Sequence, residues 1–227
     1  NSCETSNNQP QAHTDQEHMF HLSPLSRITA LTLAVAFKPS EPFLYAFVRC
    51  DRQIHHPAQT VFPFWTYGQL VLLPVLSLAS ELLGYRAVVV IGVLGRLITL
   101  LILLSATESL LLMQLSQVFI AAGFAAHPAL VAIMYRVLPA EQYARAVGLV
   151  ACSGVISEVL SSLLGQLLHD EGVEYVWLFV ISALSTCVAL VLAGSLPSPP
   201  PSKAARELIL GPRPPASAAS LLPAPIP

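Results

Sequence analysis

The sequence predicts an all-α membrane protein with six transmembrane helices. Of its 227 residues, 54% are hydrophobic and 11% are charged, and the mean hydropathy is +0.65. Soluble domains carry about 25% charged residues, so this composition indicates an integral membrane protein. Six apolar segments, each close to the roughly 20 residues that a helix needs to cross a bilayer, predict the spans. Their expected limits are 28–48, 64–84, 87–105, 109–135, 145–168 and 175–196.

Segments that cannot build a core flank the predicted membrane domain, residues 25–198. Residues 1–24 are polar and hold no apolar stretch, so we expect a disordered tail and no cleavable signal peptide. Residues 199–227 are rich in proline and alanine, which predicts a second disordered tail. The formal net charge of −2 gives no reason to expect nucleic-acid binding.

Basic residues gather on one side of the predicted spans. With the N-terminus inside, the inner segments hold seven Lys and Arg residues and the outer segments hold two. Cytosolic loops carry the excess of these residues, so both termini are expected in the cytosol. The inner residues are Arg27, Arg86, Arg136, Arg145, Lys203, Arg206 and Arg213, and the outer ones are Arg49 and Arg52.

The first span contains two charges and two prolines, in the stretch from Lys38 to Pro42. A charge at the centre of a bilayer costs about 2.5–3.5 kcal/mol, so these residues are expected to face a cavity or each other. The prolines free backbone carbonyls one turn earlier, those of Val35 and Lys38, and such groups need partners at membrane depth. Lys38 and Glu41 are three residues apart and can meet on one helical face. They form either a structural ion pair or a carboxylate that faces a substrate cavity, balanced by its neighbour.

A second interruption, His127-Pro128, falls in the fourth span. In transporters built from inverted repeats of three helices, the first and fourth spans are equivalent, and paired interruptions indicate a binding site. His127 is therefore a candidate substrate contact, and a protonatable one because histidine titrates near neutral pH. The alternative is a histidine that is hydrogen-bonded to a neighbouring helix.

Arg96 in the third span and Glu158 in the fifth are also at membrane depth. An unpaired ion there is costly, so we expect them to pair with each other or with Glu41 or Lys38. A structural role is favoured over substrate contact for both. The fifth span also carries small residues along one side, which predicts a face for close helix packing. These are Gly148, Ala151, Gly154, Ser157, Ser161 and Gly165.

Aromatic residues open the second span, in Phe-Trp-Thr-Tyr at 64–67. They are typical of an interfacial belt, but Trp65 can instead turn inward as a stacking surface for a planar ring. The inner turn that follows, at 81–86, holds Glu81, Gly84 and Arg86. This turn resembles the loop signature of the major facilitator superfamily, in which an acid and an arginine latch helices during alternating access.

Several motifs together resemble solute carrier family 19, the reduced folate and thiamine transporters. They are Lys-Pro-Ser-Glu-Pro-Phe-Leu at 38–44, Phe-Trp-Thr-Tyr at 64–67, Met-Gln-Leu at 113–115 and Leu-Leu-Gly-Gln-Leu-Leu at 163–168. The resemblance covers about residues 25–200 and is closer to the thiamine branch. It implies the N-terminal half of a major facilitator fold with a 3+3 inverted repeat, in the plasma membrane. The partners it implies are a vitamin, the lipid bilayer, and a missing C-terminal half or a second copy.

By this resemblance, Glu41 and Trp65 line the vitamin site, while His127 stands where the thiamine carriers have a carboxylate and the folate carriers an arginine. The implied function is thiamine-type uptake by alternating access. Alternatives are reduced folate-type transport, or a truncated membrane protein that associates with full-length relatives without transporting. We expect no enzyme activity, because the sequence holds no nucleotide-binding loop, nucleophile triad or metal-ligand spacing. No cofactor or metal site is expected either.

Overall fold

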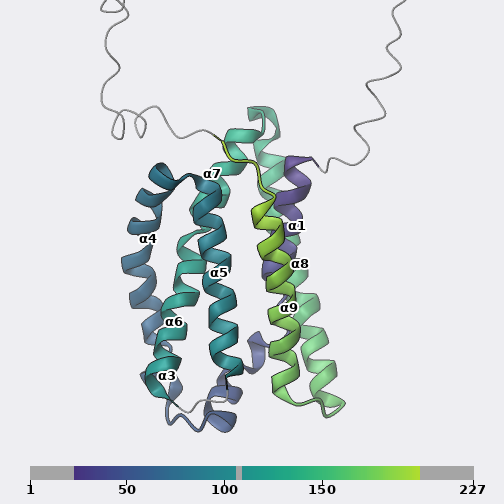
Figure 1. Cartoon of the computed structure of the whole chain (residues 1–227). Helices are drawn as coiled ribbons and strands as arrows, with labels where there is room; N and C mark the ends of the chain where they lie inside the picture. Colours follow the sequence, from purple (N-terminus) through teal and green to yellow (C-terminus); the bar gives the residue numbers. More distant parts are fainter. Residues whose placement is uncertain (1–22, 106–108, 200–227) are drawn as a thin grey trace, which may run out of the picture.

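The structure of the chain is a computed structural model that describes residues 23–105 and 109–199. Within these residues every regular element is a helix, which confirms the predicted all-α class (Figure 1). The two predicted tails fall almost wholly outside the described residues. The α-helices are α1 Pro24–Ala36, α2 Leu44–Ala46, α3 Pro57–Thr60, α4 Pro63–Leu83, α5 Tyr85–Leu104, α6 Leu110–Ala125, α7 His127–Val137, α8 Tyr143–Asp170 and α9 Tyr175–Gly194.

The last five predicted spans agree with the structure to within a few residues. Five helical segments are long and apolar enough to cross a membrane, so the chain is a multi-pass membrane protein. They are Pro57–Leu83, Tyr85–Leu104, Leu110–Val137, Ala140–Asp170 and Tyr175–Gly194.

The first predicted span, 28–48, is present but is not one continuous helix. Helix α1 ends at Ala36, and residues 37–40 have no regular helical structure. A 3₁₀ turn over Glu41–Phe43, helix α2 and a π-helical turn over Phe47–Asp51 complete the crossing. Prolines 39 and 42 lack N–H donors and disfavour α-helix in the residues before them, which accounts for the break.

Serine hydroxyls from α8 and α9 donate to two backbone carbonyls in the last turn of α1, beside the break. Ser157 donates to the Leu33 carbonyl at 2.7 Å, and Ser185 donates to the Ala34 carbonyl at 2.8 Å. The sequence had indicated the carbonyls of Val35 and Lys38. The Lys38 carbonyl instead accepts a hydrogen bond from the Glu41 N–H at 3.1 Å, at the start of the 3₁₀ turn. The two serines therefore hold the end of α1 against two other helices.

Removal of both hydroxyls, in Ser157→Ala with Ser185→Ala, is expected to destabilise the bundle by about 1–3 kcal/mol, since interhelical hydrogen bonds in membranes contribute about 0.6–1.7 kcal/mol each. Thermal unfolding of the purified chain in detergent measures this. Ser153→Ala on α8 is the matched control, because the Ser153 hydroxyl donates to Val150 of its own helix. A double variant that unfolds at the same temperature as the control would contradict the assigned role.

The interruption predicted at His127-Pro128 is real but milder than that of the first span. Helix α6 ends at Ala125 and α7 begins at His127, so only Ala126 separates them. Pro128 lies in the first turn of α7, where its missing N–H leaves no intrahelical bond unmade. The fourth span is therefore kinked, whereas the first is broken.

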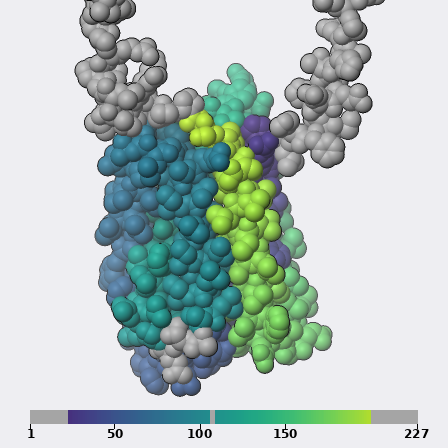
Figure 2. Space-filling model, viewed as in Figure 1, coloured from purple at the N-terminus to yellow at the C-terminus, as the bar shows by residue number. Residues whose placement is uncertain are grey.

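Both ends of the described bundle lie on the same side. In Figure 1 the start of α1 and the end of α9 are at the top, and Arg27 donates to the Ser195 carbonyl at 2.9 Å. Helix α9 packs against α5, and Figure 2 shows the two side by side on one face. An even number of crossings, as predicted, brings the chain back to the side on which it began.

Two apolar clusters form the core, one toward each end of the bundle. The first includes Ile28, Val88 and Ile133, near the end that holds both described termini. The second includes Phe47 and Phe179, near the opposite end. Polar side chains at mid-depth lie between the two clusters.

Candidate functional site

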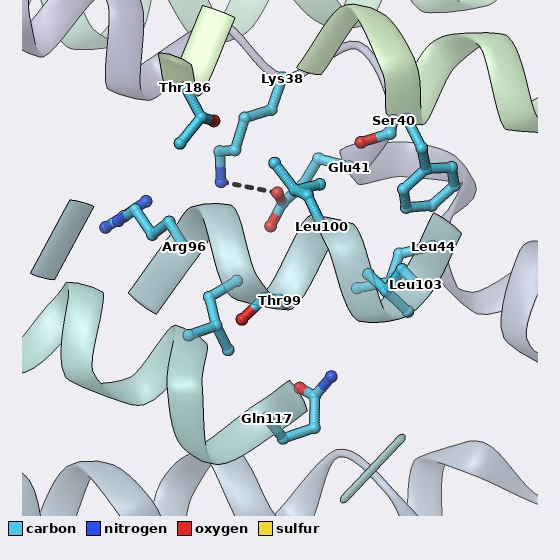
Figure 3. A pocket seen from close by; sticks show the side chains of 12 residues that line it. Lys38, Ser40, Glu41, Leu44, Arg96, Thr99, Leu100, Leu103, Gln117 and Thr186 are labelled. Carbon is cyan, nitrogen blue, oxygen red and sulfur yellow. Dashed lines mark hydrogen bonds and ion pairs between the residues drawn. The ribbon is translucent and has the colours of Figure 1, made fainter. Parts of the chain in front are cut away.

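Polar and charged side chains from four crossings line a pocket at mid-depth. The broken first span contributes Lys38 and Glu41, and single residues come from α5, α6 and α9: Arg96, Gln117 and Thr186 (Figure 3). An adjoining, more open pocket shares the three charged residues. It adds Phe124 of α6, His127 of α7, and Glu158 of α8. We refer to the two pockets together as the central cavity.

Lys38 and Glu41 form the ion pair that their spacing predicts. The Nζ of Lys38 donates to a carboxylate oxygen of Glu41 at 2.6 Å. The lysine side chain is 15% exposed and that of the glutamate is 52% exposed. The pair thus offsets the cost of the buried ammonium, while the carboxylate still faces the cavity.

Close packing with α8 fixes this segment in place. A β-carbon on Gly165 would lie 2.4 Å from the Pro39 carbonyl oxygen. Only glycine lets α8 approach the broken backbone this closely. The first span therefore packs on the part of the predicted face from Gly154, which lies against Thr32, to Gly165. At the start of that face, Gly148 and Ala151 are exposed.

Arg96 extends across α6 into the central cavity. Its guanidinium lies 4.5 Å from the centre of the Phe124 ring. A β-carbon on Gly123 would lie 2.6 Å from Cγ and Nε of Arg96, so the glycine makes the space for the arginine. Within the part of the chain that the structure describes, Arg96 forms no salt bridge with Glu158, Glu41 or any other carboxylate. The predicted pairing of Arg96 with Glu158 is therefore not formed, although both residues line the cavity.

Trp65 lies beside the cavity, against one of its lining rings. Its ring centre is 5.3 Å from that of Phe124, with the planes tilted by 59°. The Phe124 ring also contacts the Arg96 guanidinium. Trp65 remains 37% exposed, and it does not line the central cavity itself. This arrangement brings together Trp65 of the second span, Arg96 of the third and Phe124 of the fourth.

The residues of the predicted inner turn lie at the C-terminal end of α4, away from the cavity: Glu81, Gly84 and Arg86. Gly84 adopts the positive φ of 91° that a tight turn between α4 and α5 requires. Glu81 accepts a hydrogen bond from the Tyr85 hydroxyl, which itself accepts one from Arg136 at 2.7 Å. Arg86 is exposed. The arginine that joins this acid to a second span is thus Arg136 of α7, where the sequence had indicated Arg86.

The sequence reasoning missed several residues that shape the cavity. The Phe124 ring contacts both Arg96 and Trp65, and Gly123 leaves space for the Arg96 side chain. Gln117 is a buried polar residue on the same helix. The signal in the sequence was a few polar residues and a glycine inside a mostly apolar span: Gln114, Ser116, Gln117 and Gly123. Thr186 of α9 likewise reads as an ordinary residue of an apolar helix.

The cavity combines charges of both signs with aromatic surface. Carboxylates attract cationic groups, guanidinium groups bind oxyanions, and an aromatic ring offers a face to planar or cationic groups. Such a lining suits an organic ion that contains a ring and enters from water.

The model of the family described as reduced folate carrier matches residues 25–208. The chain belongs to the reduced folate carrier family. This match extends over all the described crossings, and the family resemblance read from the four motifs is confirmed.

Curated members of this family resemble the chain at about 30% identity. A folate-like transporter of Dictyostelium discoideum is 28% identical over 76% of this chain and 31% of its own length. Thiamine transporter 2 of Homo sapiens is 32% identical over 71% of this chain and 33% of its own length. Folate transporter 1 of Caenorhabditis elegans is 26% identical over 71% of this chain and 36% of its own length. The chain therefore spans about a third of the length of these relatives.

Proposed function

We propose that the chain is part of a membrane transporter for a vitamin, most closely a thiamine-type carrier, that works by alternating access. The observation that carries the proposal is the central cavity, where the Glu41 carboxylate is held at mid-depth by a helix break and faces open space. Broken helices at mid-depth are typical of substrate sites in secondary transporters. Membership of a family whose curated members are named folate and thiamine transporters supports the same conclusion.

Glu41, Trp65, His127 and Lys38 are the proposed substrate-binding residues. Glu41 attracts a cationic group and Lys38 holds that carboxylate in position. Phe124 offers a surface to a ring, and Trp65 supports Phe124 from beside the cavity. His127 lines the same cavity from the kink of the fourth span. Glu81 with Tyr85 and Arg136 is the proposed inner latch, because these side chains join α4, α5 and α7 at one end.

The proposed orientation places the end with both described termini in the cytosol, in the plasma membrane. Four arginines lie in the segments at that end: Arg27, Arg86, Arg136 and Arg145. At the other end, Asp170 closes α8, and Glu171 and Glu174 lie in the turn before α9. The positive-inside rule supports this orientation.

Folate-type transport is the competing function, since Arg96 gives the cavity a guanidinium that suits a carboxylate-bearing substrate. Radiolabelled thiamine and folate separate the two. We expect the purified chain in nanodiscs to bind thiamine, with binding displaced by unlabelled thiamine. Cells that express the chain should take up thiamine above the vector background.

Surface labelling is the control for expression in this experiment. Folate binding without thiamine binding would replace the thiamine assignment with the folate one. Normal surface expression with neither vitamin bound nor taken up would contradict transport altogether. It would favour a membrane protein that acts only by association with relatives.

A further inference from the structure

A further cavity lies beside the turn that joins α8 to α9, at the end of the bundle opposite the described termini (Figure 1). Its volume of about 450 Å³ falls within the range of about 300–1,000 Å³ that is typical of small-molecule sites. The lining comes from Asp51, which ends the π-helical turn of the first span, and from residues on both sides of the turn between α8 and α9. It shares no lining residue with the central cavity. We refer to it as the turn cavity.

The turn cavity carries negative charge without basic partners. Its acidic lining residues are Asp51 and Glu174, which come from separate elements of the fold. Both are exposed, and within residues 23–105 and 109–199 neither forms a salt bridge. No lysine or arginine of these described residues lines the cavity. A hollow that holds charges of one sign attracts ions of the other and raises their local concentration, so this cavity favours cations.

Two ring side chains also belong to the lining of the turn cavity. The imidazole of His169 and the phenol of Tyr175 stack, with ring centres 5.0 Å apart and planes tilted by 22°. An aromatic face attracts a cationic group and stacks on a planar ring. Carboxylates beside aromatic rings therefore make a lining that suits an organic cation with a ring.

The turn cavity is in contact with the segment that carries Glu41. Phe43 packs on both rings, with its ring centre 5.0 Å from that of His169 and 5.6 Å from that of Tyr175. Phe43 closes the 3₁₀ turn that Glu41 begins. The rings that line the turn cavity therefore rest on the same turn that brings Glu41 to the central cavity.

We propose that the turn cavity is a second binding site, for an organic cation with a ring, which captures the substrate before it reaches Glu41. In the proposed orientation this end of the bundle is extracellular, so the cavity meets an incoming molecule first. Asp51 and Glu174 attract the cation, and His169 and Tyr175 offer ring faces to it. The inference rests on the proposed function, since it takes the captured molecule to be the substrate of the central cavity.

The number of bound ligands gives a test that needs no variant. The full chain in nanodiscs is titrated to saturation with radiolabelled thiamine, an organic cation with a ring. We expect thiamine to occupy both cavities, so that the bound amount exceeds one molecule per chain.

Tryptophan fluorescence locates the second molecule. The chain holds two tryptophans: Trp65 lies beside the central cavity, and Trp177 lies in the first turn of α9, two residues after Tyr175. In a chain with Glu41→Gln and Trp65→Phe, the central site is weakened and Trp177 is the sole tryptophan. Thiamine should still change the emission of Trp177 and reach saturation.

Removal of both carboxylates, in Asp51→Asn with Glu174→Gln, should weaken the binding that Trp177 reports by about threefold to tenfold, because contacts between exposed charges are modest. Glu174 makes no side-chain cap hydrogen bond, so its substitution leaves the start of α9 intact. Glu171→Gln is the matched control and should change nothing, since Glu171 is an exposed carboxylate of the same turn that does not line the cavity.

Two results would overturn the inference. One is saturation at one thiamine per chain, at a site that Glu41→Gln removes. The other is an apparent affinity at Trp177 that stays the same without the carboxylates of Asp51 and Glu174. In both cases binding that depends on Glu41 leaves the proposed function standing. A Trp177 response that needs the two carboxylates, in a chain with no binding that depends on Glu41, would instead remove the proposed function and keep the turn cavity as a cation site.

Discussion

Replacement of Glu41 by glutamine is expected to weaken vitamin binding by about tenfold or more, because a charge-assisted contact contributes about 1.5–3 kcal/mol. The carboxylate is 52% exposed and faces the cavity, so its loss removes the proposed attraction for the cationic group. It also leaves the Lys38 ammonium, which is 15% exposed, without its partner at 2.6 Å. Binding of radiolabelled thiamine to the purified chain measures the effect.

Two further variants make this result specific. Glu41→Asp keeps the charge and should recover part of the binding. Glu171→Gln removes an exposed carboxylate from the turn between α8 and α9 and should leave the affinity unchanged. Wild-type affinity in Glu41→Gln, at equal yield of folded protein, would exclude Glu41 from the binding site.

The substitution Gly165→Ala is expected to have the largest effect on folding. Its β-carbon would lie 2.4 Å from the carbonyl oxygen of Pro39, and a backbone oxygen cannot rotate aside as a side chain can. Either α8 or the broken segment must shift, so we expect destabilisation of about 1–3 kcal/mol or more, typical of overpacking. Because Glu41 follows two residues after Pro39, ligand binding should fall as well.

Gly148→Ala is the matched control on the same helix. A β-carbon there meets nothing within 4 Å, and alanine favours helix over glycine by about 1 kcal/mol. Thermal unfolding in detergent should therefore show a lower midpoint for Gly165→Ala and an equal or higher one for Gly148→Ala. Equal midpoints for both variants would show that the approach of α8 to the break is not tight.

Helix limits could be read from the sequence because each span is a long apolar run with a clear edge. The break was also predictable, since two prolines and two charges occur within six residues of one span. Its form was not. A helix that ends at Ala36 and a helix that bends there have the same sequence pattern, and the choice depends on the hydroxyls of Ser157 and Ser185 from distant spans.

Contacts within the cavity depend on how each helix is rotated about its axis. An apolar span with one charged residue does not reveal which neighbour that residue faces, so the sequence left Glu158 and Glu41 open as partners of Arg96. The structure places Arg96 on Phe124, and Phe124 against Trp65. At the end of the bundle that holds both described termini, the same ambiguity hid the contact of Arg136 with the Tyr85 hydroxyl, 51 residues away in the sequence.

The break in the first span has a mechanical consequence. A helix with a gap in its backbone hydrogen bonds is ordinarily a hinge, free to bend by itself. Here the last carbonyls of α1 are tied to α8 by Ser157 and to α9 by Ser185, and Ser40 beyond the gap is tied to Ser182 of α9 at 2.8 Å. The segment that carries Glu41 cannot swing without moving both helices. The break is therefore not a free hinge, and we expect the first span, α8 and α9 to move together as one body.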